Sequence, residues 1–314
     1  MIPQTDSGWK DRHVLVTGSA GFIGQHLSRK LTSLGARVYA GVFPEIASER
    51  IDALPESVTL VPLDVRDEHS VEGALSVSEP STVFHLAAMG ATDAGIAAVP
   101  ALETNTLGTI QLLEAVRDRS IDRLILVGTC AEYGEREDVE GLDPINFYAA
   151  SKAAAWAFAR AYWRLHDVPV VTARLFQVYG PGQPFCSLVP AAIRSALGGE
   201  DFAITPGEQA RDFIYVDDVV DGLLAAAMAN GVTGQSVDLG RGRANTVVSV
   251  VKRIWELIDP PCDIQVGALP YRPGVVMRLV ADADRTARLI GWRAETGLEE
   301  GLRLTVRAVR EEIE

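Results

Sequence analysis

A tyrosine and a lysine, four residues apart, are the side chains of this sequence with the clearest chemical use. Tyr148 and Lys152 lie in a stretch with helical periodicity, where this spacing places both on one face of the helix. A phenol with a pKa near ~10 is a poor base at neutral pH, and lowering that pKa by ~3 units takes ~4 kcal/mol of electrostatic help. A neighbouring ammonium provides part of that help. The pair predicts acid–base chemistry, although taken alone it is equally typical of an amphipathic helix that carries both residues by coincidence.

A threonine upstream of this pair strengthens the chemical interpretation. Thr129 follows the apolar run of residues 123–127, which is typical of a buried strand. Its hydroxyl could hold the same oxygen atom that the Tyr148 phenol protonates or deprotonates. We therefore take Thr129, Tyr148 and Lys152 together as candidate catalytic residues and call them the catalytic trio.

A glycine-rich turn near the N-terminus predicts a binding site for a dinucleotide. An apolar run ends and a helical pattern begins across the segment that contains Gly18, Gly21, Phe22, Ile23 and Gly24. Glycines let the backbone approach phosphates closely, and the N–H groups at the start of a helix attract the negative charge of a pyrophosphate. A tight structural turn is the alternative, but a strand before it and a helix after it favour nucleotide binding.

Apolar runs and helical patterns alternate along the first half of the chain. The runs typical of strands are residues 14–16, 38–43, 58–61, 82–86, 123–127 and 168–175, and the helical patterns cover residues 22–34, 102–119 and 147–166. Continuous apolar strands that alternate with helices are typical of a parallel sheet covered on both faces. The sequence therefore predicts an α/β fold with a Rossmann-type, doubly wound parallel sheet, whose ligands bind at the carboxyl ends of the strands.

The pattern loosens after Gly180, where several prolines interrupt it. We expect residues 1–179 to form the nucleotide-binding domain and residues 180–314 to form a smaller, mixed α/β lobe that binds the substrate. The helical pattern at 217–230 is rich in Val, Leu and Ala. Segments within about 211–240 are therefore expected to return to the sheet of the first domain.

Composition and charge exclude several classes of protein. The chain has 314 residues, 47% of them hydrophobic, so it can bury a large core. A net charge of −13 opposes binding to nucleic acid and to anionic membranes. The 3 cysteines and 5 histidines lack metal-ligand or disulfide spacing, and we find neither a secretion signal nor a membrane-spanning run. We expect a cytoplasmic protein without a metal site.

Further segments make the chain resemble the extended branch of the short-chain dehydrogenase/reductase superfamily, in its nucleotide-sugar epimerase/dehydratase group. The resemblance covers nearly the whole chain and includes the glycine turn and the catalytic trio. The other matching segments are His85-Leu86-Ala87-Ala88, Asp64-Val65, Asn105, the loop Arg174 to Gly182, the motif Arg211-Asp212-Phe213 and the late segment Arg272-Pro273-Gly274. One residue departs from the pattern, because Gln177 stands where asparagine is usual.

The resemblance implies ligands and residue roles. NAD or NADP would lie against the glycine turn, with Asp64 and Val65 on its adenine side and Lys152 on the nicotinamide ribose. The remaining cofactor residues that it implies are Leu86, Ala87, Ala88 and Asn105. The substrate would be a nucleotide-diphosphate sugar, and its contacts would be Thr129, Gln177, Arg211 and Arg272. The group often dimerises through two helices of each subunit, here those at 102–119 and after Tyr148, so we expect a homodimer.

The two arginines also make sense physically. A guanidinium can grip paired diphosphate oxygens in bidentate fashion, and in an acidic protein such a clamp has to be local. The alternative for Arg211 is a surface ion pair with Asp212 or Asp217. Four aromatic residues follow Tyr148 in the same helical stretch: Trp156, Phe158, Tyr162 and Trp163. They are more typical of packing or a subunit contact than of a nucleic-acid platform.

These residues lead to three functional hypotheses. The first is an NDP-hexose 4-epimerase, which oxidises the sugar to a bound 4-ketone and returns the hydride to the other face. The second is an NADPH-dependent 4-reductase of an NDP-4-keto-6-deoxyhexose. The third is a non-catalytic nucleotide sensor, which would have no chemical need for the intact catalytic trio.

Dehydratases and decarboxylases of the group are not expected, for a reason that lies beside Thr129. The dehydratase pattern T-D-E-x-Y-G places an acid and a glutamate base directly after the threonine, whereas this chain has Cys130 and Ala131 there. Glu132 is displaced by one residue. On an extended segment it would point to the opposite side.

The end of the second predicted strand bears on the choice of cofactor. An NAD-selective site normally has an acidic residue there, but the position is Val42, and no arginine replaces the acid. Glu45 or Arg50 could reach back with opposite effects. We therefore expect weak discrimination between NAD and NADP, within about tenfold or ~1.4 kcal/mol.

Overall fold

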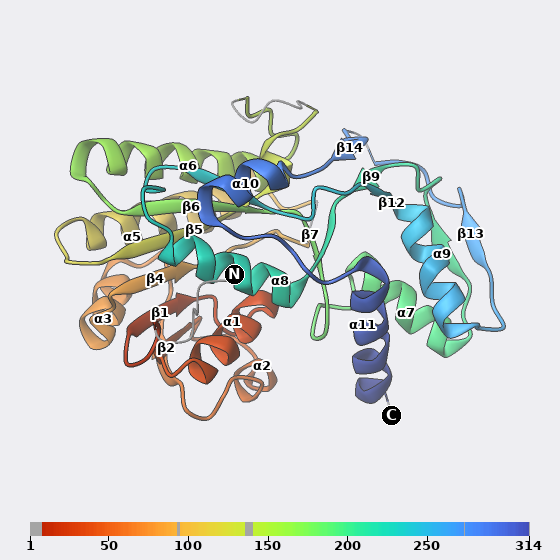
Figure 1. Cartoon of the computed structure of the whole chain (residues 1–314), viewed down its shortest axis with the longest axis horizontal. Coiled ribbons are helices and arrows are strands. Elements are labelled where there is room, and N and C mark those ends of the chain that lie inside the picture. Colours follow the sequence, from red (N-terminus) through yellow and green to blue (C-terminus); the bar gives the residue numbers. More distant parts are fainter. Residues whose placement is uncertain (1–7, 93–94, 136–140, 273, 314) are drawn as a thin grey trace.

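Seven parallel strands form the centre of the molecule, in the order β11-β6-β5-β4-β1-β2-β3 (Figure 1). The computed structural model describes residues 8–92, 95–135, 141–272 and 274–313. The strands are β1 (His13–Thr17), β2 (Arg37–Val42), β3 (Thr59–Pro62), β4 (Thr82–His85), β5 (Arg123–Thr129), β6 (Val170–Leu175) and β11 (Ser236–Leu239). This sheet confirms the predicted Rossmann-type fold.

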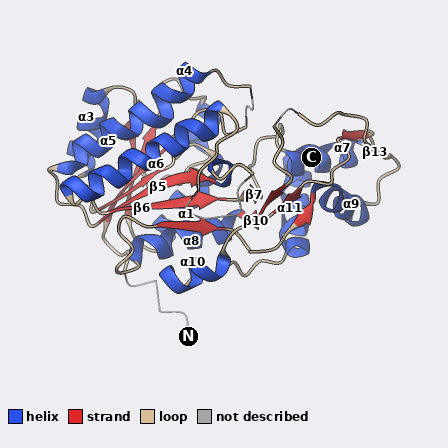
Figure 2. Cartoon of the chain, turned by 90° about the horizontal axis from the view of Figure 1, so that it is seen from above, coloured by secondary structure: helices blue, strands red, loops and turns tan. Residues whose placement is uncertain are grey.

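Helices cover both faces of the sheet because its strands are apolar on both sides. On β1, Val14 and Val16 belong to one buried cluster and Leu15 belongs to another, as alternation along a strand requires. Helices α1 (Phe22–Ser33) and α8 (Val216–Met228) pack together in the first cluster. Helices α3 (Glu68–Ser78), α5 (Gly108–Arg117) and α6 (Phe147–His166) cover the opposite face (Figure 2).

The chain reverses its direction across the sheet between β1 and β4. It first passes from β1 outward to β2 and β3, and then returns to build β4, β5 and β6 on the other side. Such a reversal leaves a crevice at the carboxyl ends of the two central strands, where ligands bind in open α/β sheets. The glycine turn follows β1. His85 is the last residue of β4 and Leu86-Ala87-Ala88 follow it, so both segments border this crevice.

The C-terminal lobe is a smaller, mixed assembly of short strands and helices (Figures 1 and 2). Its strands are β7 (Gln177–Tyr179) with β10 (Phe213–Tyr215), β8 (Phe202–Ile204) with β13 (Ile264–Val266), and β9 (Ala210–Arg211) between β12 (Asn245–Thr246) and β14 (Arg278–Leu279). Its helices are α7 (Leu188–Gly198), α9 (Val247–Ile258) and α11 (Leu298–Ile313), whereas α10 (Ala283–Ile290) packs against β11 of the large sheet. Helix α8 and strand β11 come from the same stretch of sequence but belong to the large sheet and its cover.

Short elements refine the sequence prediction. The helix expected at 102–119 is α4 (Ala98–Ala101), a π-helical turn (Leu102–Leu107) and α5 in succession. Helix α3 and the short α2 (Ser48–Asp52) were not predicted. No helix in the described ranges is long and apolar enough to span a bilayer.

Candidate active site

The catalytic trio comes together where β5 ends and α6 begins. Thr129 is the last residue of β5, and Tyr148 and Lys152 occupy the first two turns of α6. The helix starts here because Asn146 caps it, accepting a hydrogen bond from the Ala149 N–H at 2.8 Å. The Lys152 ammonium is buried and donates to the Val127 carbonyl of β5 at 2.8 Å, which leaves two of its N–H bonds for a ligand.

Within the described ranges, no group accepts a hydrogen bond from the Thr129 hydroxyl. Its Oγ1 accepts from the Ala131 N–H at 3.3 Å, so the threonine caps the 3-10 turn Cys130–Glu132. Because that contact uses only a lone pair, the Thr129 O–H can still donate to a reacting oxygen. The hydroxyl therefore has the capacity that the sequence analysis assigned to it.

Burial opposes the charged forms of both titrating members of the trio. It raises the pKa of the Tyr148 phenol above its ordinary value, and the negative charge of Glu132 raises it further. It lowers the pKa of the Lys152 ammonium to about 8, against an opposing effect of Glu132. The lowering of the phenol pKa that the sequence analysis called for is thus not produced by these surroundings, and positive charge from a bound cofactor has to provide it.

The glycine turn forms a cradle that fits a pyrophosphate. A Cβ atom on Gly18 would lie 2.7 Å from the Ala87 backbone nitrogen, and one on Gly24 would lie 2.3 Å from the Gly18 carbonyl oxygen. Gly21 caps α1 without a side-chain bond, and the first turn of α1 carries no acidic residue. The backbone N–H groups at the start of α1 are therefore open to an anion, as a dinucleotide requires. Phe22 and Ile23 form the beginning of that helix.

A buried chain of hydrogen bonds fixes the backbone after β4. The His85 ring lies between Thr17 Oγ1, at 2.8 Å from Nδ1, and Thr109 Oγ1, at 3.0 Å from Nε2. Since Thr109 donates to the Asn105 carbonyl, its oxygen accepts from His85 Nε2–H, and Nδ1 accepts from Thr17. Thr17 in turn accepts from the Ala87 N–H at 3.0 Å. Burial lowers the pKa of His85 to about 3, so the ring is neutral and holds the Leu86–Ala88 backbone in place.

Asn105 is placed differently from what a cofactor contact needs. The residue is fully buried, and its amide accepts from the Met89 N–H and donates to the Met89 carbonyl and to Ser151 Oγ, all within 2.9 Å. It therefore ties the loop after β4 to α6. In the described structure its side chain supports the walls of the site.

The adenine side of the crevice holds an exposed ion pair. Asp64 accepts from the Arg66 guanidinium through both oxygens, at 2.9 and 2.8 Å, and this bonding holds the pKa of the Asp64 carboxyl below its usual value. The same guanidinium lies over the ring of Phe43, 5.3 Å from its centre. Phe43 follows Val42, the last residue of β2. No arginine occupies the position of Val42, as expected, but the loop after β3 brings Arg66 beside Phe43, which the sequence did not indicate.

The substrate arginines have different environments. Arg211 is half-buried and donates to the carbonyls of Ala210 and Val276, and burial lowers its pKa. It forms an ion pair with neither Asp212 nor Asp217 in the described structure, so the alternative of a surface pair is not observed. Arg272 is exposed and has no described side-chain partner, and Pro273, beside it, lies outside the described residues.

Gln177 opens β7 and is paired with Phe213 of β10. Its backbone N–H donates to the Asp212 carbonyl at 2.9 Å. Asp212 is itself fully buried and accepts from the N–H groups of Arg241, Gly242 and Ala281. This carboxylate organises the loops behind Arg211, a role that the motif match did not indicate.

Glu132 corrects a second expectation. It lies on the 3-10 turn and not on an extended segment, and its carboxylate folds back under Thr129, whose N–H it accepts at 2.8 Å. The other carboxylate oxygen accepts from Arg174 Nε at 2.7 Å, and both side chains are fully buried. The sequence does not indicate this pair, because the two residues lie at the ends of different strands.

The aromatic residues of α6 are used mainly for packing. Arg174 lies between the rings of Tyr133 and Trp156, and Arg160 lies between those of Trp156 and Trp163. This stack holds α6 against β6 and β11, as the packing interpretation predicted. Phe158 differs, because it is exposed on the outer side of the helix.

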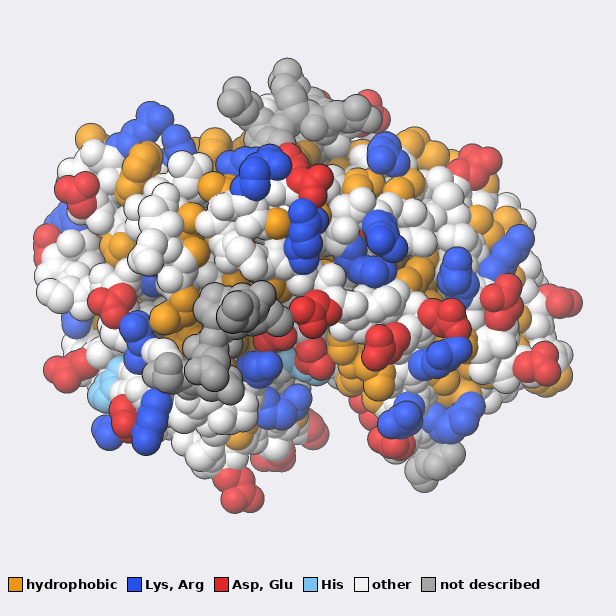
Figure 3. Space-filling view, viewed as in Figure 1, with side chains coloured by type: hydrophobic (Ala, Val, Ile, Leu, Met, Phe, Trp, Pro, Cys, Tyr) orange, Lys and Arg blue, Asp and Glu red, His pale blue; other side chains and the backbone are white. Residues whose placement is uncertain are grey.

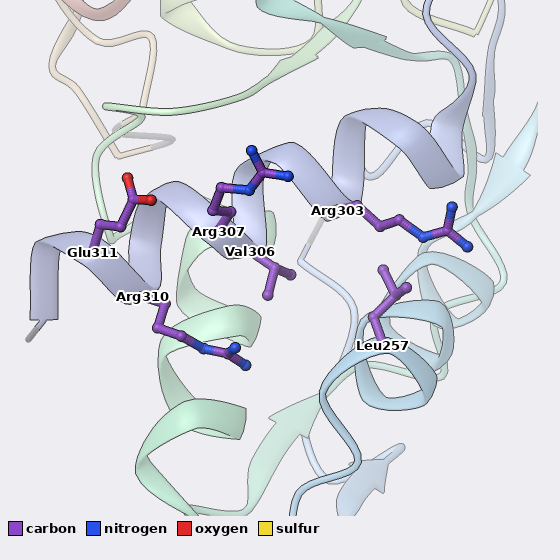
Figure 4. A pocket seen from close by; sticks show the side chains of 6 residues that line it. All are labelled: Leu257, Arg303, Val306, Arg307, Arg310 and Glu311. Atoms are coloured by element: carbon purple, nitrogen blue, oxygen red, sulfur yellow. The ribbon is translucent and has the colours of Figure 1, made fainter.

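A pocket between α9 and α11 is lined by Leu257, Arg303, Val306, Arg307, Arg310 and Glu311 (Figure 4). On the face shown in Figure 3, acidic and basic side chains are interspersed over the whole surface. Within the described ranges, no three His, Cys, Asp or Glu side chains are grouped so as to hold a metal ion.

Comparisons with known proteins agree with this architecture. A family model described as "NAD dependent epimerase/dehydratase family" matches residues 14–240. A dTDP-glucose 4,6-dehydratase of Xanthomonas campestris is 31% identical over 93% of this chain and 91% of its own. A crystal structure of UDP-glucose 4-epimerase from Thermotoga maritima, with UDP-glucose, has a TM-score of 0.90 and 29% identity over 96% of this chain and 99% of that one. The UDP-glucose 4-epimerase of Thermus thermophilus, in complex with NAD, has a TM-score of 0.83 and 30% identity over 95% and 98% of the two chains.

Proposed function

The chain belongs to the NAD-dependent epimerase/dehydratase family, and on that premise we propose that it is a nucleotide-sugar 4-epimerase. The reaction would oxidise the sugar 4-hydroxyl to a bound ketone and return the hydride to the opposite face. Relatives of the chain include both epimerases and dehydratases, so the family alone leaves the reaction open. The residues directly after Thr129 are the basis on which we choose epimerisation over dehydration.

Dehydration needs an acid and a base beside the threonine, and this chain has neither. Ala131 has no functional group, and burial raises the pKa of the Cys130 thiol to about 12, so the thiol stays protonated at neutral pH. The carboxylate of Glu132, on the same turn, is occupied at both oxygens by Thr129 and Arg174. This arrangement favours a reaction that keeps the sugar's hydroxyl groups, as epimerisation and simple reduction both do.

The residues around the crevice fit a bound dinucleotide. The glycine cradle and the start of α1 would hold the pyrophosphate, Asp64 and Val65 would flank the adenine, and the Leu86–Ala88 backbone would flank the nicotinamide. Lys152 would donate its free N–H bonds to the nicotinamide ribose. NAD, when bound, accepts a hydride and gives it back.

The catalytic trio would move the proton that accompanies this hydride. Tyr148 takes the proton from the sugar 4-hydroxyl during oxidation and returns it during reduction. Thr129 donates its free O–H to the same sugar oxygen and so fixes its position. Lys152 and the positive charge of a bound nicotinamide would together stabilise the ionised phenol.

The C-terminal lobe, from Gly180 onward, would hold the nucleotide diphosphate. Arg211 supports this assignment because it is half-buried, lacks a carboxylate partner in the described structure and lies within electrostatic reach of Cys130 beside the trio. A diphosphate would compensate its charge. Gln177, on β7, and Arg272 are further proposed contacts.

We also propose that the protein is a homodimer through the outer face of α6. Phe147, Phe158 and Leu165 are exposed there at helical spacing, and Leu107 is exposed at the end of the neighbouring π-helical turn. Burying such a stripe against its own copy would remove it from water. Sedimentation of the wild type and of Phe158→Glu tests this: a dimer and a monomer are expected, and a monomeric wild type would contradict it.

The deciding experiment separates the epimerase from its alternatives. The protein is denatured, the released nucleotide is measured, and native protein is then incubated with UDP-glucose or dTDP-glucose and followed by NMR. An epimerase should release stoichiometric NAD and convert the sugar to its 4-epimer without added cofactor. Turnover only with NADPH and a 4-keto sugar would establish the reductase instead. The observation that favours this alternative is the absence of an acidic residue at the end of β2. Loss of water from the sugar, with solvent deuterium incorporated in the ring, would overturn both.

A further inference from the structure

The buried ion pair between Glu132 and Arg174 lies directly behind the catalytic trio. We propose that Glu132 is a positioning residue, which fixes the backbone of Thr129 and places a buried negative charge within reach of Lys152. The inference rests on the proposed function for its catalytic meaning. Its geometry does not depend on which sugar is the substrate.

The backbone contact is the first step. Glu132 Oε1 accepts from the Thr129 N–H at 2.8 Å, while Thr129 Oγ1 accepts from the Ala131 N–H, so the turn closes on itself at the end of β5. Gly128 makes room for this, because a Cβ atom there would lie 2.5 Å from the carboxylate oxygen. The direction of the Thr129 side chain is thereby fixed at the point where the strand ends.

Arg174 holds the carboxylate in this position. Its Nε donates to Glu132 Oε2 at 2.7 Å, and its guanidinium is sandwiched between Tyr133 and Trp156, with the ring centres at 5.0 and 5.1 Å. Tyr133 continues the network by donating to Asp238 of β11 at 2.7 Å. These neighbours hold the buried pair in a single arrangement. Removing either charge alone would leave the other buried and uncompensated.

The charge of Glu132 is the second step. Glu132 from the 3-10 turn and His85 from β4 interact electrostatically with Lys152, and of these two only Glu132 carries a carboxylate. Burial lowers the pKa of Lys152 to about 8, and Glu132 opposes that shift. Without this charge the ammonium would lose its proton at a lower pH, and both the phenol and the ribose would lose their cation.

The test compares variants that keep or remove each contribution. Glu132→Gln/Arg174→Met removes both charges together, so neither is left unpaired, and glutamine can still accept from the Thr129 N–H. Glu132→Leu/Arg174→Met removes the acceptor as well. Tyr133→Phe is the control, because it removes a hydroxyl that bonds Arg174 and Asp238 and leaves both Glu132 and the Arg174 charge in place. NADH binding is titrated by fluorescence from pH 6 to 9.5, without any sugar, so the result stands whether or not the proposed epimerisation is correct.

The NADH affinity of the wild type and of Tyr133→Phe should fall as the pH rises, with an inflection near pH 8. In both double variants this inflection should lie about one pH unit lower. The Gln double variant should also keep at least about tenfold more kcat than the Leu double variant, each at its best pH. An unchanged inflection in folded double variants would overturn the charge role. Equal kcat in the two double variants would overturn the role in fixing Thr129.

Discussion

Two arginine–carboxylate pairs lie at the carboxyl edge of the same sheet, in opposite environments. Arg174 and Glu132 are 1% and 0% exposed, whereas Arg66 and Asp64 are 40% and 23% exposed. The buried pair is enclosed by aromatic rings and bonded to the backbone beside Thr129. The exposed pair rests on Phe43 and faces solvent. The pairs have similar bond lengths, so burial decides what each can do.

Water screens the exposed pair, and its members can exchange partners at little cost when a ligand arrives. The buried pair cannot exchange partners, so it is suited to fixing geometry. Arg211 is an intermediate case, a half-buried guanidinium whose described partners are only backbone carbonyls. From this comparison we propose a positioning role for Arg174 and ligand binding for Arg66 and Arg211.

The largest expected effect comes from the phenol beside the buried pair. Tyr148→Phe should lower kcat by about 10²- to 10⁴-fold, since it removes the proton donor and acceptor, and should change NADH affinity by no more than a few-fold. Tyr162→Phe, on the same helix, is the control and should retain kcat, because its hydroxyl only bonds Glu114. Retention of more than about a tenth of the activity in Tyr148→Phe would rule out the acid–base role.

Stability measurements test the comparison directly. Arg174→Met should lower the free energy of unfolding by about 3 to 5 kcal/mol, because Glu132 is left charged and buried. Arg66→Gln should cost less than about 1 kcal/mol, because water replaces the lost bonds. Urea denaturation of both variants provides the numbers. Equal losses would mean that burial does not distinguish the pairs.

The intermediate arginine should show its effect in ligand binding. Arg211→Ala is expected to weaken binding of UDP by about 2 to 4 kcal/mol, since a charged ligand loses its partner in a partly desolvated site. Arg253→Ala, on the exposed side of α9, is the matched control. Calorimetric titration with UDP measures both, and equal affinities would exclude Arg211 from the diphosphate site.

The fold and the catalytic trio could be predicted because their signals are local. Apolar runs predicted the strands, and helix α6 was predicted at its observed bounds, 147–166. Helix α3 was missed although Val71, Ala74 and Leu75 form an apolar face at helical spacing. The Glu132–Arg174 pair and the approach of Arg66 to Phe43 join residues at or beyond the ends of different strands, and no local pattern predicts such contacts. Asn105 was predicted from its motif, which does not reveal the direction of its side chain.

Acid sensitivity extends the comparison to a buried histidine. The folded-state pKa of His85 is about 3 and its ordinary value is 6.5, so the neutral ring contributes stability above pH 6.5 that is lost as the pH falls. Between pH 6.5 and 5 this loss should approach about 2 kcal/mol. His85→Gln should be less stable at neutral pH and should lack this part of the acid dependence. Parallel stability curves for the two proteins, from urea midpoints across this range, would contradict the prediction.

The smallest effect concerns the exposed pair and the choice of cofactor. A 2′-phosphate on the adenosine ribose would meet the Arg66 guanidinium at the end of β2, but it would compete there with Asp64, and Glu45 acts on the same guanidinium. The attraction of the phosphate to the Arg66 cation is thus nearly balanced by its repulsion from the acids around it.

Wild-type affinities for NADH and NADPH should lie within about tenfold, ~1.4 kcal/mol. Arg66→Gln should weaken NADPH by about three- to tenfold and NADH by less than about twofold, because only the phosphate needs the charge. Glu45→Gln removes a negative charge that repels the 2′-phosphate, so it should shift the preference toward NADPH. Fluorescence titration at low and high salt gives these ratios, and the difference should shrink as salt screens the exposed charges. If Arg66→Gln changed both affinities equally, Arg66 would be supporting the adenine site through Asp64, and the exposed pair would act as the buried one does.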